Sequence, residues 1–203
     1  MPWWYCILGI WLGIPAPVFI LWFLCQIFGP ITRFRGLKKI NKNQLARFVK
    51  DNNSLNKTAF LFVTRWKTEK SNYGPQGFYY DAHEAFVLRT LWGACACIAF
   101  DIYPELSRVC VRQIQGKKGT EIFLSRLRWE KFLLDYATQW AHRNRFKEIW
   151  VQSSRLNKWC PKVGDDLWVE REQKKFKLRY DVTAKRMGFK FDEYSGHYIK
   201  SLT

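Results

Sequence analysis

The chain has 203 residues, a formal net charge of +17 and 18% aromatic residues, and its length suits one domain with a buried core. The excess of Lys and Arg favours a polyanionic partner, which can be anionic lipid, nucleic acid or a phosphorylated cofactor. The six cysteines do not show the spacing usual for zinc sites. The closest pair, Cys95 and Cys97, has one residue between its members, whereas zinc ligands usually have two to four. We expect reduced thiols in the core and no metal ion.

The N-terminal segment is the most apolar part of the chain. Residues 1–32 contain no charged side chain, and the run from Trp3 to Phe28 exceeds the ~20 residues that span a bilayer. A basic leader and a small-residue cleavage site are both missing, so we do not expect a cleaved signal peptide. The sequence predicts a membrane anchor over residues 1–32, as one transmembrane helix or, because of Pro15 and Pro17, a re-entrant segment.

A basic stretch follows this segment and orients it. Residues 33–50 carry seven Lys or Arg and no acid. The positive-inside rule therefore predicts a single-pass membrane protein with its C-terminal domain on the cytoplasmic side. We expect residues 33–55 to be a juxtamembrane linker whose cations contact anionic lipid headgroups.

The rest of the chain, residues 56–203, is predicted to form one α/β domain. A strand is expected at 56–66 and a helix at 79–92. Two further strands, 94–102 and 106–114, are joined by a short turn and should form an antiparallel hairpin.

The stretch QIQGKKG, residues 113–119, connects this hairpin to a predicted amphipathic helix at 124–141. A strand at 147–153 and a further helix that ends at Gly188 come next. Two short strands around residues 195–196 close the chain. This part of the sequence therefore predicts a strand-helix-strand unit followed by a helix and a final hairpin.

This order of elements resembles the GNAT acetyltransferase superfamily over residues 94–202. The strand leading into QIQGKKG looks like the family's pyrophosphate loop, usually written Q/R-x-x-G-x-G/A, and residues 124–153 look like the helix and strand of its acyl-CoA site. Residues 184–192, AKRMGFKFD, are similar to the family's helix ending in Gly-Phe. The resemblance implies a GNAT-like mixed sheet flanked by helices, acetyl-CoA or another acyl-CoA as cofactor, and acyl transfer to an amine that the sequence does not identify.

The resemblance also implies a cofactor-binding set. Glycines let backbone N–H groups approach a pyrophosphate, and lysines add positive charge. The expected cofactor-binding residues are Gln113, Gln115, Gly116, Lys117, Lys118, Gly119 and Asn157.

Candidate catalytic residues follow from the same comparison. In the family, a Tyr four residues before the Gly of Gly-Phe returns a proton to the departing thiolate, and this chain has Ala184 there. Tyr180 lies one turn earlier on the same helix face and is the candidate general acid. Glu105 is the candidate general base, with Asp101 and His197 near other strand ends as alternatives.

Two other functions remain open at this point. The GNAT-like domain can be a non-catalytic, membrane-anchored interaction or assembly module, or a basic domain that binds anionic lipid or nucleic acid. The position of Tyr180 separates catalysis from the inert module: a hydroxyl at the mouth of splayed strands favours catalysis, and a hydroxyl packed into the core favours the module.

Overall fold

The computed structural model describes residues 34–40, 46–49, 61–74, 76–90, 93–162 and 167–202. The chain divides into two compact units, Met1–Phe34 and Arg35–Thr203. The predicted anchor lies outside the described residues. Among the residues that the structure describes, no helix is long and apolar enough to cross a membrane.

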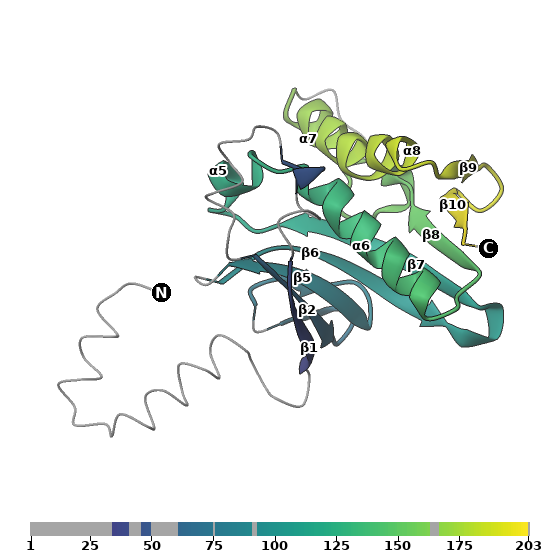
Figure 1. The fold of residues 1–203 in the computed structure, drawn as a ribbon. Coiled ribbons are helices and arrows are strands. Elements are labelled where there is room, and N and C mark those ends of the chain that lie inside the picture. Colours follow the sequence, from purple (N-terminus) through teal and green to yellow (C-terminus); the bar gives the residue numbers. More distant parts are fainter. Residues whose placement is uncertain are drawn as a thin grey trace, which may run out of the picture. The chain divides into compact units, whose positions relative to one another are not determined.

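An eight-stranded sheet forms the centre of the second unit (Figure 1). In spatial order its strands are β1 (Phe34–Lys39), β2 (Phe62–Lys67), β5 (Glu84–Thr90), β6 (Gly93–Tyr103), β7 (Arg108–Gly116), β8 (Glu148–Gln152), β10 (His197–Ser201) and β9 (Lys190–Asp192). The pairs from β2 to β7 and from β8 to β9 are antiparallel, whereas β7 and β8 are parallel. The fold is therefore a mixed α/β fold, as predicted.

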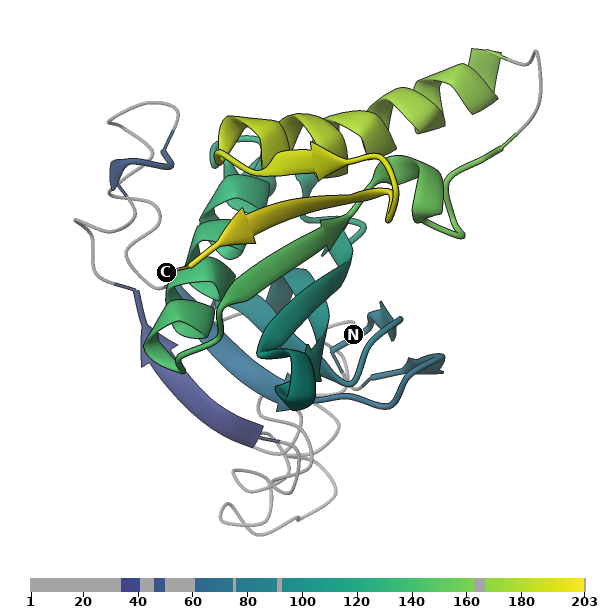
Figure 2. The same ribbon diagram turned by 90° about the vertical axis from the view of Figure 1, so that its right-hand side faces the viewer.

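Helices and one small additional sheet complete the described part. The helices are α5 (Glu121–Leu124), α6 (Trp129–Arg143), α7 (Leu167–Lys177) and α8 (Thr183–Arg186). A π-helical turn, Leu178–Val182, joins α7 to α8, and Figure 2 shows the three as one rod that passes over β9 and β10. The additional sheet pairs β3 (Asn72–Tyr73) with β4 (Tyr79–Tyr80).

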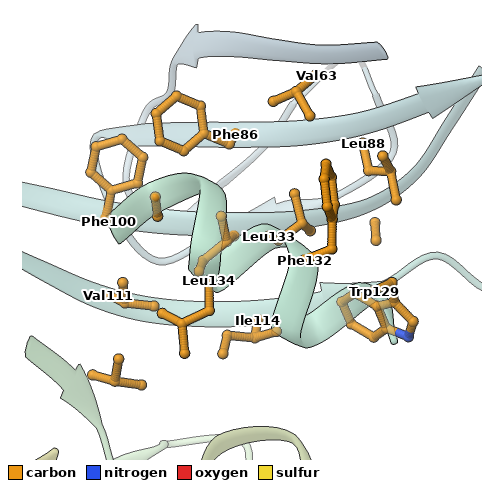
Figure 3. Close-up of a cluster of buried hydrophobic side chains, with 14 of the residues drawn as sticks. Val63, Phe86, Leu88, Phe100, Val111, Ile114, Trp129, Phe132, Leu133 and Leu134 are labelled. Atoms are coloured by element: carbon orange, nitrogen blue, oxygen red, sulfur yellow. The ribbon is translucent and has the colours of Figure 1, made fainter. Parts of the chain in front are cut away.

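The core lies between α6 and the sheet. Helix α6 contacts β5, β6 and β8, and Figure 3 shows its side chains Leu133 and Leu134 among residues of the strands, such as Phe86 and Val111. All four are at most 1% exposed. Burial of each such side chain is worth about 1.5–3 kcal/mol, so this helix–sheet contact is a main source of stability.

Most elements expected in the second half of the chain are confirmed. The predicted hairpin corresponds to β6 and β7, the strand at 147–153 to β8, and the closing strands to β9 and β10. The predicted helix at 124–141 corresponds to α6, which begins later, at Trp129, and is preceded by the short α5. Gly188 ends α8 as expected, with a φ of 79° and the Phe189 N–H bonded to the Ala184 carbonyl.

The helix predicted at 79–92 is wrong. This segment contains β4, a short turn and β5, the strand between β2 and β6. The first six residues of β5 are buried, because the strand is central and covered on both faces. Such strands are apolar at nearly every position, so they carry no alternation that distinguishes them from a helix.

The predicted linker at 33–55 also contains a strand of the domain. Its described residues are 34–40 and 46–49, and β1 forms the edge of the eight-stranded sheet. A second described piece reaches α6, since the Arg128 N–H donates to the Phe48 carbonyl at 2.8 Å. Strand β1 thus enlarges the sheet that positions the site.

The parallel strands β7 and β8 separate after a short pairing. Their pairing runs from Arg108 with Glu148 to Val111 with Val151, after which β8 ends at Gln152 and β7 continues to Gly116. A register shift in the pairing of β6 with β7 leaves Arg112 as the extra residue of β7, and such bulges bend a strand. The outer edge of β7 is therefore not paired with β8 over its last residues.

Candidate functional site

A pocket of about 240 Å³ lies where β7 and β8 separate. Strand β7, the turn after β8, the β3–β4 sheet and the rod of α7 contribute its walls. It is lined by Tyr73, Tyr79, Gln113, Ile114, Gln115, Asn157, Trp159, Phe176, Arg179 and Tyr180. The fold therefore brings together Tyr180 and three of the predicted cofactor-binding residues.

The Tyr180 side chain crosses from the helical rod to the open edge of β7. Its ring is 1% exposed and stacks on Phe176 with the centroids 6.1 Å apart. Its hydroxyl oxygen accepts hydrogen bonds from the Ile114 N–H and from Asn157 Nδ2, both at 2.9 Å. The ring is thus buried, while the hydroxyl lies at the strand separation.

The hydrogen-bond pattern leaves the Tyr180 proton available. The amide orientation of Asn157 is fixed because its Oδ1 accepts the Trp159 N–H at 2.9 Å, so Nδ2 is the group that donates to Tyr180. Both bonds use the lone pairs of the hydroxyl, and no acceptor for its hydrogen is found among the described residues. Burial raises the pKa of Tyr180, which keeps the phenol protonated at neutral pH.

A local change in helix geometry accompanies this position. Tyr180 lies inside the π-helical turn, a feature that is frequent at functional sites. Ala184, at the place of the family's Tyr, is fully buried in the core, and α8 contacts α6. A phenol at residue 184 would have no room, whereas Tyr180 reaches the pocket.

The free edge of β7 adds a backbone donor. The Lys117 N–H bonds to the Cys95 carbonyl at 2.7 Å on the β6 side. Because backbone donors alternate along a strand, the Gly116 N–H points to the opposite edge, the same edge on which the Ile114 N–H meets Tyr180. The prediction that Gly116 can offer its backbone N–H to a ligand is consistent with this direction.

The turn after Gly116 departs from the expected phosphate loop. The Lys117 N–H is already bonded, and its Nζ donates to the Gln76 carbonyl at 3.1 Å. The backbone N–H groups of Glu121 and, to a smaller extent, Gly119 lower the pKa of the Glu121 carboxyl. The Lys117 N–H is therefore not free for a pyrophosphate, whereas exposed Lys118 keeps an unbonded N–H among the described residues, and the cofactor-binding role of the turn stays a prediction.

Close packing explains the absence of a side chain at Gly116. A Cβ there would lie 3.0 Å from Leu124 Cδ1 and 3.4 Å from Trp129 Cζ2. Such a distance is tight, so Leu124 would have to shift. Packing against Leu124 and Trp129 is thus at least one reason why residue 116 is a glycine.

The two glutamines connect β7 to the segment that begins at β4. Gln113 is buried, and its Nε2 donates to the Tyr79 carbonyl at 2.7 Å and to Gln115 Oε1 at 2.5 Å. Its Oε1 accepts the Asp81 N–H at 3.2 Å. Gln113 is therefore engaged inside the fold and acts on the pocket by positioning its wall.

The predicted bases lie away from the Tyr180 hydroxyl. Glu105 is exposed in the turn before β7, nine residues before Ile114, and the part of β7 from Arg108 to Ile114 alone spans roughly 20 Å. Asp101 bonds through its two oxygens to the His83 ring at 2.9 Å and to Arg112 Nε at 3.3 Å. The structure does not bring Glu105 or Asp101 to the pocket.

His197 is the alternative base closest to the strand separation. It pairs with Gln152, at the end of β8, and burial lowers its pKa, so the ring is neutral at neutral pH. One ring nitrogen, Nδ1, lies 2.7 Å from the Ser195 carbonyl. The residue is not among those that line the pocket.

Three residues of the site were missed from the sequence. The Asp81 carboxylate pairs with Lys158 Nζ at 2.7 Å and accepts from Trp159 Nε1 at 2.8 Å. Arg179 lines the pocket, and its Nε is buried with no hydrogen-bond partner in the described part of the chain. The signal was weak, because Asp81, Trp159 and Arg179 are far apart in sequence and belong to no spacing motif.

No group of three or more His, Cys, Asp or Glu side chains that could hold a metal ion lies within the described residues. Burial raises the pKa of the Cys97 thiol and raises that of Cys110 to about 11. Both thiols are buried in the sheet and are free cysteines. They are therefore protonated core side chains at neutral pH.

Comparisons with known proteins give structural matches alone. No protein-family model matches the sequence, and no match is found with curated proteins. A GNAT-family N-acetyltransferase of Escherichia coli in complex with CoA is 11% identical, with a TM-score of 0.35 over 86% of this chain and 84% of that one. The aminoglycoside 6'-N-acetyltransferase of Enterococcus faecium is 9% identical, with a TM-score of 0.38 over 83% and 98%. A GNAT-family acetyltransferase of Staphylococcus aureus is 11% identical, with a TM-score of 0.38 over 83% and 99%. Scores this low do not establish a family for the chain.

Proposed function

We propose that this protein is a membrane-anchored N-acyltransferase of GNAT type, which binds an acyl-CoA at the open edge of β7 and transfers the acyl group to an amine. The observation that carries the proposal is the Tyr180 hydroxyl, which lies at the strand separation and is fixed by the Ile114 N–H and Asn157 Nδ2. The ring belongs to the buried core, whereas the hydroxyl lies next to the open edge of β7, so the proposal depends on the hydroxyl alone.

The residues of the pocket suit the thioester end of such a cofactor. Bound acyl-CoA would supply a thioester carbonyl and a thiolate leaving group. Tyr180, kept protonated by burial, would donate its proton to the sulfur as general acid. The Gly116 N–H would hold the cofactor along β7, and the Arg179 guanidinium would favour negative charge in the pocket.

On the amine side, the C–N bond to the acyl carbon would form as the C–S bond breaks, and the protons that the ammonium group loses would pass to water, since no Asp, Glu or His is among the described residues that line the pocket. Asp81 is a carboxylate that contacts the pocket walls, through its backbone bond to Gln113 and its side-chain bond to Trp159. We infer that Asp81, and not Glu105, orients the amine. The membrane anchor at residues 1–32 and the cytoplasmic orientation belong to the same proposal, supported by the uncharged N-terminal run and the basic residues after it.

Calorimetric titration of the full chain in detergent with acetyl-CoA tests the proposal. We expect saturable binding that is lost when the pocket is filled by Gln115→Trp and kept in Gln139→Trp, a matched change on the exposed face of α6. Release of free thiol after addition of primary amines then distinguishes an enzyme from a non-catalytic binding module. A folded protein that does not bind acetyl-CoA would exclude the acyl-CoA proposal.

A second candidate function, binding of anionic lipid headgroups, is favoured by a different surface. A groove of about 980 Å³ runs between the turn after β8 and the rod of α7 and α8. Its charged lining residues are five cations, Arg155, Lys162, Lys174, Lys177 and Lys185, and three acids, Glu170, Asp181 and Glu193. Co-sedimentation with phosphatidylserine vesicles should weaken steeply with salt, and charge reversal at Lys174 and Lys177 should weaken it further.

A further inference from the structure

One lysine of the chain occupies a cation site at the mouth of the pocket. Lys158 Nζ lies 2.7 Å from Asp81 Oδ1, 5.4 Å from the ring centroid of Tyr79 and 5.1 Å from that of Trp159. A carboxylate and two aromatic rings are the groups that hold an ammonium ion in protein recognition sites. Lys158 is thus bound as a cationic ligand would be.

The walls of this site are fixed by other contacts. Trp159 Nε1 donates to Asp81 Oδ2 at 2.8 Å, and the Tyr79 and Trp159 rings meet edge to face at 5.5 Å. The Asp81 backbone is held by Gln113 at 3.2 Å. The carboxylate and the rings are therefore bound to one another and to the sheet independently of Lys158.

The same site adjoins the reacting end of the pocket. Tyr79 and Trp159 line the pocket together with Tyr180. Lys158 follows Asn157, whose Nδ2 is bonded to the Tyr180 hydroxyl. An ammonium group held by Asp81 thus lies at the entrance that an amine would use to reach Tyr180.

The Lys158 side chain is not held in place by burial. Its side chain is 53% exposed, whereas that of Asp81 is 11% exposed. The ion pair with Asp81 raises the pKa of Lys158, so the bound form is the ammonium ion. Because the Lys158 side chain is exposed, rotation about its bonds can move its ammonium group away from the Asp81 carboxylate. Another ammonium group can then bind there.

We propose that Asp81, Tyr79 and Trp159 form a subsite for a primary alkylammonium group, and that Lys158 occupies this subsite until an external amine displaces it. The inference rests on the proposed function in one respect, namely that the displacing amine is the acyl acceptor. The ligand chemistry is an unbranched primary ammonium, which either a protein lysine or a free diamine supplies.

The test compares amine binding in variants of the full chain by calorimetry. Lys158→Met keeps the side-chain length and removes the charge, and Lys190→Met, on an exposed lysine of β9, is the control. The probes are cadaverine and Nα-acetyl-lysine methylamide, which represent the two sources. We expect Lys158→Met to bind at least one probe ten or more times tighter than the unchanged protein, and Lys190→Met to show no gain.

Asp81→Asn in the Lys158→Met background should remove the gain, and thermal melting of each variant verifies folding. Equal binding in Lys158→Met and the unchanged protein, or a gain that survives Asp81→Asn, would overturn the inference. Acetyl-CoA titration of the same samples separates the two proposals: failure of acetyl-CoA binding with the amine pattern intact removes the acyltransferase and leaves the subsite. If acetyl-CoA binds but the variants do not show the expected changes in amine affinity, the subsite is excluded and the acyltransferase proposal remains.

Discussion

The edge of β7 and the glycine turn that follows it are neighbours in sequence but differ in what they offer a ligand. At the edge, the Tyr180 hydroxyl retains a proton without an acceptor in the described chain, and the Gly116 N–H points away from β6. In the turn, the Lys117 N–H is bonded to the Cys95 carbonyl, and the Glu121 carboxyl has a pKa lowered by the Glu121 and Gly119 N–H groups. The chain's own groups satisfy the turn and leave the edge open.

This difference shows that a glycine- and lysine-rich motif indicates where a site lies, but not which of its backbone N–H groups are free to bind a ligand. Glycines permit close backbone approach, and the approaching group can be the chain itself. Gly116 is approached by Leu124 and Trp129. We therefore expect changes at the strand edge to have larger effects on acyl transfer than changes in the turn.

Removal of the Tyr180 hydroxyl should have the largest effect. Tyr180→Phe takes away the proposed general acid, so the turnover number for amine acylation should fall about 100-fold or more, while the acetyl-CoA dissociation constant changes less than about threefold. Because burial raises the pKa of Tyr180, the unchanged enzyme should show no loss of turnover from this group up to about pH 10. Steady-state thiol release measures both quantities.

The control for this change is Tyr194→Phe, since that side chain is fully exposed. Tyr180→Phe also leaves two donors without their acceptor, which costs about 1–3 kcal/mol, so assays belong at a temperature where both variants are folded. Unchanged turnover in a folded Tyr180→Phe protein would show that another group protonates the thiolate.

Loss of the positive charge of Arg179 should have the second largest effect. Arg179 has a buried Nε without a hydrogen-bond partner in the described structure and lines the pocket beside Tyr180. Arg179→Gln should weaken acetyl-CoA binding about tenfold, because a charge-assisted contact is worth roughly 1.5–3 kcal/mol. Arg171→Gln, on the exposed part of α7, should leave the dissociation constant unchanged. Equal affinities for both variants would place the anionic part of the cofactor elsewhere.

The sequence predicted local elements better than their spatial relations. The hairpin β6–β7, strand β8 and the stop at Gly188 follow from turn residues and apolar patterns, which act over a few residues. The sequence predicts a helix for strand β5 because the strand lies inside the sheet, between β2 and β6, and is buried along its length, so its sequence shows no apolar–polar alternation. Contacts with elements distant in sequence, and not the local pattern, determine that this segment is a strand.

The site was predicted in part for the same reason. Gln113, Gln115, Asn157 and Tyr180 all line the pocket, since they lie next to elements whose order was correct. Asp81 was not selected, because its contacts with Lys158 and Trp159 span more than 70 residues. The role of the glycine turn as a phosphate site stays a prediction, and its pattern alone does not indicate that the exposed Glu121 carboxylate follows it closely.

A methyl group at Gly116 tests how far packing alone explains this glycine. Gly116→Ala places a Cβ 3.0 Å from Leu124 Cδ1 and should cost roughly 1–2 kcal/mol of unfolding free energy. In a Leu124→Ala background the added methyl should cost much less, because the clashing atom is gone. Urea denaturation of the four proteins gives the coupling energy. A coupling energy near zero would mean that Leu124 does not restrict residue 116.

The smallest expected effect belongs to the carboxylate that fills the turn. Glu121→Gln removes a negative charge beside Lys118 and frees the Gly119 N–H, so acetyl-CoA should bind about threefold tighter at low salt. The gain should vanish at high salt, because Glu121 is fully exposed and its charge is screened there. Glu130→Gln, in the first turn of α6, is the matched control. If Glu121→Gln instead strengthened binding tenfold or more, the turn would be a phosphate site held closed by Glu121, and the distinction between strand edge and turn would no longer hold.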